Sequence, residues 1–136
     1  MESGRTVSLL IPYKFIEGET LVYLQKKSEN APRLPGYFGF WGGGEELSES
    51  PEQALKREIK EELGIDPEGY IFFKRYEQEA IKNVYICEVD DTFENKIKIS
   101  EGDYGKWFSE SEASAELKLS DGDKIVLGEV YKNFKK

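Results

Sequence analysis

The sequence contains no histidine among its 136 residues, and this absence removes several chemistries at once. Catalysis by a Ser-His or Cys-His pair requires that residue, and so do histidine-rich zinc sites. Only one cysteine, Cys87, is present, so an internal disulfide bond is excluded and a reducing compartment is favoured. Because Cys87 lies in a strand-like run, we interpret it as a small core residue rather than a nucleophile.

Long hydrophobic runs and an excess of basic residues are also missing. The apolar segment 7–11 is far too short to span a bilayer, and no signal-peptide pattern is present, so we expect a cytoplasmic protein without a membrane partner. The 19 lysines and arginines stand against 27 acidic residues, which gives a net charge of −8. A nucleic-acid groove needs basic density, so we expect no nucleic-acid polymer as a partner. A phosphate ligand would need a bridging cation.

The pattern along the chain indicates one domain of mixed α/β character. No repeat or linker-like composition shift divides the sequence, so we expect a single domain over residues 1–136. Strands are predicted at residues 6–15, 20–26, 70–79, 80–89 and 96–100. A long loop is expected at 28–40, a break at glycines 42–44, and a final helix at 123–134. This order predicts an α/β (α+β) fold with a mixed β-sheet covered by helices.

One further helix has clear boundaries in the sequence, from Pro51 to Leu63. Ser50 suits the N-cap, proline suits the first helical position, and Gln53 completes a capping box three residues later. Gly64 suits the left-handed position just past the C-terminus. The sequence therefore predicts where this helix begins and ends.

Three glutamates share one arc of this helix. At about 100° per residue, Glu58, Glu61 and Glu62 fall beside an apolar stripe that consists of Leu55, Ile59 and Leu63. The like charges repel one another at i,i+3 and i,i+4 spacing, and near the C-terminus they oppose the helix dipole. Two interpretations stand: a solvated acidic face, or a site where a hard divalent cation turns the repulsion into binding.

The spacing around this helix resembles a known motif. Gly43 is followed after five residues by Glu49, and seven residues later by the run Arg57-Glu58-Ile59-Lys60-Glu61-Glu62-Leu63-Gly64-Ile65. Every fixed position is filled, so this stretch resembles the box of the Nudix hydrolase family, and of its MutT-like members in particular. The resemblance implies a Nudix-type α/β/α sandwich. One departure is Trp41, where many members have proline, and it affects the expected shape of the substrate pocket rather than the ligands.

The resemblance also implies roles for the residues of the box. It assigns the metal ions, Mg²⁺ or Mn²⁺, to the carboxylates of Glu58, Glu61 and Glu62. Such ions neutralise a diphosphate and polarise it towards attack by water. Arg57 would orient Glu49 through a bidentate pair, the alternative being a solvated helix charge. Glu49 would have a structural role beside the site rather than bind the metal directly. Gly43 would let the backbone approach the metal closely.

A general base must also take a proton from the attacking water. MutT-like proteins often use a glutamate on a loop shortly before an aromatic-ended strand, and segment 101–108 resembles that region. The resemblance therefore implies that Glu101 is the base or an additional metal ligand, the alternative being an ordinary acidic loop residue. Because members of the family differ on this point, Glu61 or Glu62 is the other choice of base.

The expected partner is a small nucleotide or nucleoside diphosphate derivative. Aromatic platforms for a base are available at Tyr37, Phe38 and Phe40, before the box. Asp121 precedes the last helix, where MutT-like proteins often place a base-reading amide or acid. Each of these four residues also suits a core or surface role. The preferred substrate is a nucleoside triphosphate, oxidised forms included, cleaved to the monophosphate and pyrophosphate.

Three alternatives remain open. The first is a hydrolase of nucleotide sugars or other nucleoside diphosphate derivatives, the second a non-catalytic nucleotide-binding Nudix domain, and the third a purely structural acidic module. Regulatory domains of the family usually lose a box glutamate, whereas this chain keeps all of them, so turnover is favoured. Family members are often homodimers, but the sequence identifies no surface patch for a second copy.

Overall fold

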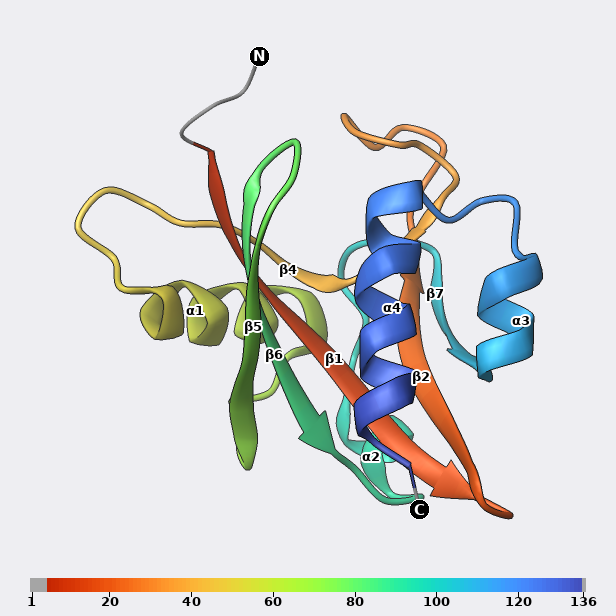
Figure 1. The fold of residues 1–136 in the computed structure, drawn as a ribbon. Coiled ribbons are helices and arrows are strands. Elements are labelled where there is room, and N and C mark those ends of the chain that lie inside the picture. Colours follow the sequence, from red (N-terminus) through yellow and green to blue (C-terminus); the bar gives the residue numbers. More distant parts are fainter. Residues whose placement is uncertain (1–4, 136) are drawn as a thin grey trace.

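The structure is a computed structural model that describes residues 5–135. Its strands are β1 (Thr6–Ile16), β2 (Glu19–Lys26), β3 (Phe38–Gly39), β4 (Trp41–Gly44), β5 (Tyr70–Glu77), β6 (Ile81–Glu88) and β7 (Tyr104–Phe108). Its helices are α1 (Pro51–Leu63), α2 (Phe93–Lys96), α3 (Glu110–Ala115) and α4 (Asp121–Asn133). The strands form one mixed sheet with α1 and α4 on opposite sides (Figure 1). The predicted α+β class is confirmed.

Strand β1 organises the sheet because it pairs with three other strands. It runs parallel to β6 from Thr6 beside Ile81 to Tyr13 beside Glu88. On its other edge it pairs antiparallel with β4 at residues 7–10 and with β2 at residues 13–16. Strand β2 then leaves β1 and continues between β3 and β7. The glycine strand β4 is thereby placed beside the start of β1.

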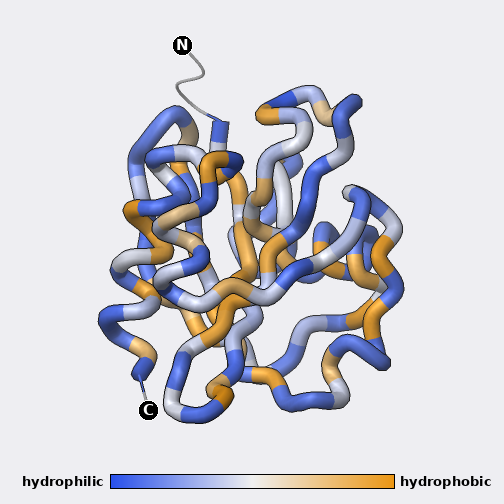
Figure 2. The backbone as a smooth tube through the Cα atoms, turned by 90° about the vertical axis from the view of Figure 1, so that its right-hand side faces the viewer, coloured by the Kyte–Doolittle hydropathy of each residue, from blue (hydrophilic) through white to orange (hydrophobic). Residues whose placement is uncertain are grey.

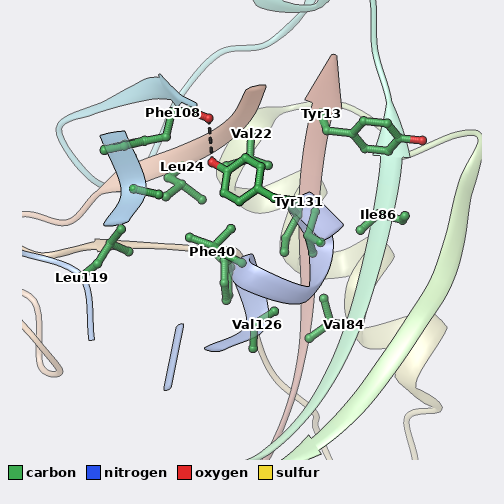
Figure 3. Close-up of a cluster of buried hydrophobic side chains, with 14 of the residues drawn as sticks. Tyr13, Val22, Leu24, Phe40, Val84, Ile86, Phe108, Leu119, Val126 and Tyr131 are labelled. Atoms are coloured by element: carbon green, nitrogen blue, oxygen red, sulfur yellow. Dashed lines mark hydrogen bonds between the residues drawn. The ribbon is translucent and has the colours of Figure 1, made fainter. Parts of the chain in front are cut away.

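Two hydrophobic clusters lie on the two faces of the sheet. The cluster beneath α4 contains Tyr131, whose hydroxyl donates a 2.7 Å hydrogen bond to the carbonyl oxygen of Phe108 (Figure 3). The cluster beneath α1 consists of Leu10, Tyr23, Trp41, Leu55, Ile59, Leu63, Tyr85, Cys87 and Phe93. Successive residues of β6, such as Val84 and Tyr85, enter different clusters, as expected of a strand buried on both faces.

Several predicted elements are confirmed, and α1 agrees to the residue. Ser50 accepts a hydrogen bond from the Gln53 N–H in a capping box, and Gly64 ends the helix with a φ of 72°. The strands predicted at 6–15, 20–26, 70–79 and 80–89 correspond to β1, β2, β5 and β6. Cys87 is buried, and burial raises the pKa of its thiol to about 12, as suits a core residue.

The break predicted at glycines 42–44 is wrong, because these residues form β4. Gly42 lies against β1 with a φ of 122°, and a Cβ there would stand 2.1 Å from the carbonyl oxygen of Ser8. Glycine permits this close pairing where another residue would clash. The loop predicted at 28–40 also ends early, because Phe38–Gly39 pairs with β2.

The strand predicted at 96–100 is wrong as well. Residues 93–96 form the short helix α2, and the N–H groups of Lys98 and Ser100 donate to the carbonyls of Leu63 and Glu62, both at 2.9 Å. Instead of joining the sheet, this segment supplies hydrogen-bond donors to carbonyl groups at the C-terminal end of α1, which have no partner within the helix. Helix α3 was not predicted, although Ser109 and Glu112 form its capping box.

Hydrophobic segments run through the middle of the molecule, whereas the outer loops are mostly hydrophilic (Figure 2). Within residues 5–135, no helix combines the length and apolar character needed to cross a membrane.

Candidate active site

The glycine strand β4 lies against the acidic arc of α1. The backbone N–H of Gly42 donates a 2.7 Å hydrogen bond to Oε1 of Glu62. A Cβ placed on Gly43 would stand only 2.5 Å from Oε1 of Glu58. Because Gly43 has no side chain, the backbone of β4 and the carboxylates of α1 meet directly.

Glu62 is the most buried of the three glutamates, with 4% of its surface exposed. Burial, together with the charges of Glu58, Glu101 and Glu61, raises the pKa of Glu62 to about 8 against the hydrogen bond from Gly42. A carboxylate without water and near like charges is disfavoured as an anion. A bound cation would reverse that balance.

Glu58 and Glu61 continue the arc towards solvent. The Glu58 side chain is 16% exposed, and burial raises its pKa although Arg57 acts in the opposite direction. The Glu61 side chain is 51% exposed and lies 3.5 Å from Nη1 of Arg57. The three carboxylates therefore form a series from core to surface on one side of α1.

Arg57 connects α1 to the segment that precedes it. Its Nε and Nη2 donate to the two carboxylate oxygens of Glu49 at 2.7 and 3.0 Å, which is the bidentate pair expected from the sequence. Nη1 donates to Oε2 of Glu58 at 2.7 Å, and Nη2 also donates to the carbonyl of Gly44 at 2.9 Å. The hydrogen bonds from Arg57 hold the pKa of Glu49 at about 2. One guanidinium thus fixes Glu49, Glu58 and the end of β4 together.

Glu101 approaches this group from a different part of the chain. The preceding residue, Ser100, is hydrogen-bonded to the backbone of Glu62, and the Gln25 amide donates to the Glu101 carbonyl at 3.0 Å. The charge of Glu101 raises the pKa of both Glu58 and Glu62. Its own side chain is exposed, so it stands at the solvent side of the acidic group.

Within residues 5–135, no three side chains of metal-binding types are gathered closely enough to hold a metal ion as they stand. The donors nevertheless fit a divalent cation, because carboxylate oxygens are the ligands that Mg²⁺ and Mn²⁺ prefer. Glu62, whose pKa burial raises, and Glu58 above Gly43 are the groups that a cation would stabilise most.

The four residues considered for base recognition are divided between core and surface. Phe38 and Phe40 are 5% and 7% exposed and belong to the cluster beneath α4, in which Figure 3 places Phe40. Tyr37 is partly exposed, with Nζ of Lys118 5.3 Å from its ring centre. Asp121 is the exposed first residue of α4. Only Tyr37 and Asp121 offer free surface.

Sequence reasoning missed a buried ion pair at the start of α4. Asp123 is 7% exposed and lies 3.3 Å from Nζ of Lys82, which is also buried. A signal existed: Lys82 shares a strand face with Val84 and Ile86, and Asp123 stands three residues before Val126 on the buried side of α4.

Trp41, the departure from the usual proline, fills core volume. It is fully buried and stacked on Tyr23 with ring centres 5.7 Å apart. Its indole N–H donates a 3.0 Å hydrogen bond to the Tyr23 carbonyl. Tryptophan therefore anchors β4 to β2.

A family model described as the NUDIX domain matches residues 5–130. A curated relative, the 8-oxo-dGTP diphosphatase of Escherichia coli (strain K12), is 34% identical over 58 residues. That match covers 43% of this chain and 44% of the relative, so it spans less than half of either protein.

Solved structures share the fold over nearly the whole chain. A MutT structure from work on Aliivibrio salmonicida and Vibrio cholerae has a TM-score of 0.75 at 21% identity, covering 98% of this chain and 100% of that one. The MutT protein of Methanosarcina mazei Go1 has a TM-score of 0.73 at 23% identity, covering 100% and 99%. The NUDIX domain of Shewanella oneidensis NrtR, solved with ADP ribose, has a TM-score of 0.71 at 14% identity, covering 95% and 88%.

Proposed function

Because the chain belongs to the Nudix family, we propose that it is a Mg²⁺-dependent pyrophosphohydrolase of small nucleotide derivatives. The preferred substrate is a nucleoside triphosphate, oxidised forms included, which is cleaved to the monophosphate and pyrophosphate. The observation that carries this proposal is the contact of Gly42 and Gly43 with the carboxylates of Glu62 and Glu58. This contact supports a site where carboxylates and backbone surround a cation and a diphosphate.

The metal ligands in this proposal are Glu58, Glu61 and Glu62, with Mg²⁺ or Mn²⁺ as the ion. A bound ion would neutralise the diphosphate and polarise phosphorus for attack by water. Arg57 holds Glu58 in place through its charge-assisted hydrogen bonds, and Glu49 holds Arg57. The protein thereby contributes orientation as well as ligands.

Glu101 is the proposed general base. Its exposed side chain stands beside the acidic group and meets solvent, so it can accept a proton from the attacking water. Glu61 and Glu62 are the alternative bases. Of these two, the half-exposed Glu61 is the more accessible to water.

The triphosphate substrate is supported by the relative described as an 8-oxo-dGTP diphosphatase, although that match is short. Hydrolysis of a nucleotide sugar or another nucleoside diphosphate derivative is the alternative within the same chemistry. A non-catalytic nucleotide-binding domain is disfavoured, because every glutamate of the box is present. A single domain over residues 1–136, a cytoplasmic location and a homodimer stay predictions.

A nucleotide panel assayed for phosphate release tests this proposal. Each compound is incubated with the protein and Mg²⁺, and a phosphatase converts the products to inorganic phosphate. We expect release from nucleoside triphosphates, dependence on Mg²⁺, and loss of release in the Glu62→Gln variant. A folded protein that hydrolyses no diphosphate compound, with Mg²⁺ or Mn²⁺, would overturn the enzyme proposal.

A further inference from the structure

Gln25 is a polar residue of β2 that is buried, with only 8% of its surface exposed. Tyr23, two residues earlier, belongs to the cluster beneath α1, so alternation along the strand places the Gln25 side chain on the same side of the sheet as the acidic arc. Leu24 faces the other way, into the cluster beneath α4. A buried amide needs hydrogen bonds to offset its lost hydration, so the partner of Gln25 indicates its role.

The strands on both sides of β2 leave room for this side chain. Gln25 stands opposite Gly39 of β3 and Gly105 of β7, neither of which has a side chain. Its Nε2 donates a 3.0 Å hydrogen bond to the carbonyl oxygen of Glu101, in the loop before β7. A Cβ on the next residue, Gly102, would stand 3.0 Å from that Nε2. The amide of Gln25 therefore packs directly against the backbone of the loop that carries Glu101.

The loop is attached on both sides of Glu101 by backbone hydrogen bonds. The N–H of Ser100 donates to a carbonyl at the end of α1 at 2.9 Å, and the N–H of Asp103 donates to a carbonyl of β2 at 2.8 Å. In the part of the chain that the structure describes, the backbone of Glu101 and Gly102 is held by one hydrogen bond, the one from Gln25. Removal of this bond would leave both ends of the loop attached and release its middle.

The place of the Glu101 carboxyl group depends on this backbone. The side chain is exposed, so water rather than packing surrounds it, yet its charge is close enough to raise the pKa of Glu62. A general base must lie within hydrogen-bond reach of the proton that it accepts, and a misplacement of about 1 Å can cost two orders of magnitude in rate. An exposed side chain on a loop obtains such accuracy from a backbone that is held in place.

Building on the proposed function, in which Glu101 is the general base, we propose that Gln25 is a positioning residue that fixes Glu101 through its backbone carbonyl. Gln25 acts through Glu101 and needs no contact with the substrate. The alternative is a structural role, in which the same hydrogen bond stabilises the fold without influence on the chemical step. The two roles differ in whether the effect of a Gln25 substitution depends on the carboxyl group of Glu101.

Gln25→Met removes the amide but keeps a side chain of similar length and volume. We expect kcat to fall by about 10- to 100-fold, as a misplacement of the base by about 1 Å can cause. KM should change by less than about two-fold, because substrate binding is not affected. In the Glu101→Gln background the same substitution should lower kcat no further, since the group that Gln25 positions is already gone. A structural role predicts equal losses in both backgrounds.

Gln78→Met is the matched control. The amide of Gln78 also donates to a backbone carbonyl, that of Gly122 at 3.2 Å, but at the start of α4 rather than at the Glu101 loop. Gln78 also accepts a 2.8 Å hydrogen bond from Lys82, so its substitution should lower the melting temperature at least as much as Gln25→Met. Its kcat should nevertheless stay within about two-fold of the wild-type value. Loss of stability alone would then not explain a slow Gln25→Met variant.

A measurement that needs no turnover follows the loop itself. In EDTA, order parameters from ¹⁵N relaxation should fall at Glu101 and Gly102 in Gln25→Met, from about 0.85 towards about 0.6. They should stay unchanged at Ser100 and Asp103, whose N–H groups keep their partners. Unchanged order parameters at Glu101 and Gly102 would show that Gln25 does not hold the loop, and would overturn the proposal.

The kinetic results can overturn it as well. A wild-type kcat in Gln25→Met, or equal losses in the two backgrounds, would remove the positioning role. If Glu101→Gln keeps its rate, the general base is another residue and the role of Gln25 falls with that assignment. If no compound is hydrolysed with Mg²⁺ or Mn²⁺, the proposed function fails separately, and the order parameters decide whether Gln25 holds Glu101.

Discussion

Gly43 and Glu58 lie so close that not even a methyl group fits between them, since a Cβ on Gly43 would stand 2.5 Å from Oε1 of Glu58. We therefore expect Gly43→Ala to displace the Glu58 carboxylate and to lower kcat/KM by about 100-fold, as a misplacement near 1 Å can. Gly44→Ala is the matched control, because its nearest neighbour would be the Thr6 carbonyl oxygen at 4.0 Å. Equal losses in both variants would show that the strand, not the carboxylate, is sensitive.

Glu62→Gln separates activity from stability. The amide keeps an oxygen for the Gly42 N–H but removes a buried ionisable carboxyl group that lies among other acids. We expect kcat/KM to fall by about 100-fold or more, because a lost metal ligand removes several kcal/mol of transition-state stabilisation. In EDTA the melting temperature should stay equal or rise. A variant that remains fully active would remove Glu62 from the metal site.

The pKa of Glu62 also predicts how stability depends on pH without metal. Burial, together with the neighbouring acids, raises this pKa to about 8, whereas in the unfolded chain the pKa of the carboxyl group has its ordinary value of 4.5. Between these values the folded protein binds more protons than the unfolded chain, so its stability falls as pH rises from 4.5 to 8. Urea unfolding in EDTA across this range should show the decline, and Glu62→Gln should flatten it. An unchanged slope in the variant would contradict the assignment.

The parts of the site that could be predicted from the sequence are those that depend on residues close to one another in the chain. Helix α1 follows from caps and periodicity within one segment, and its spacing placed Glu58, Glu61 and Glu62 on one side. The strand β4 could not be predicted, because glycines extend there only through pairing with β1. The pair of Lys82 and Asp123 joins residues 41 positions apart, and only the folded topology brings them together.

Arg57→Lys tests whether the guanidinium group orients the neighbouring carboxylates, because the substitution keeps the positive charge. Lysine cannot reproduce the two parallel hydrogen bonds to Glu49 together with those to Glu58 and the Gly44 carbonyl. We expect kcat/KM to fall by about 10- to 100-fold, as when a residue supporting metal ligands is lost. Glu49→Gln should give a similar loss, and the double variant should be little worse than either. Additive losses in this cycle would show that the two residues act separately.

Glu101→Gln tests the general base. Removal of a base lowers the rate of the chemical step by about 100- to 10,000-fold, so we expect kcat to fall by that range with little change in KM. Asp103→Asn is the control, because Asp103 is an exposed acid of the same loop and its backbone N–H stays bonded to the Lys26 carbonyl at 2.8 Å. Stopped-flow rates under single-turnover conditions separate chemistry from product release. If Glu101→Gln keeps its rate, the base is one of the α1 acids, and Glu61→Gln, the more accessible of the two, should then carry the loss in kcat.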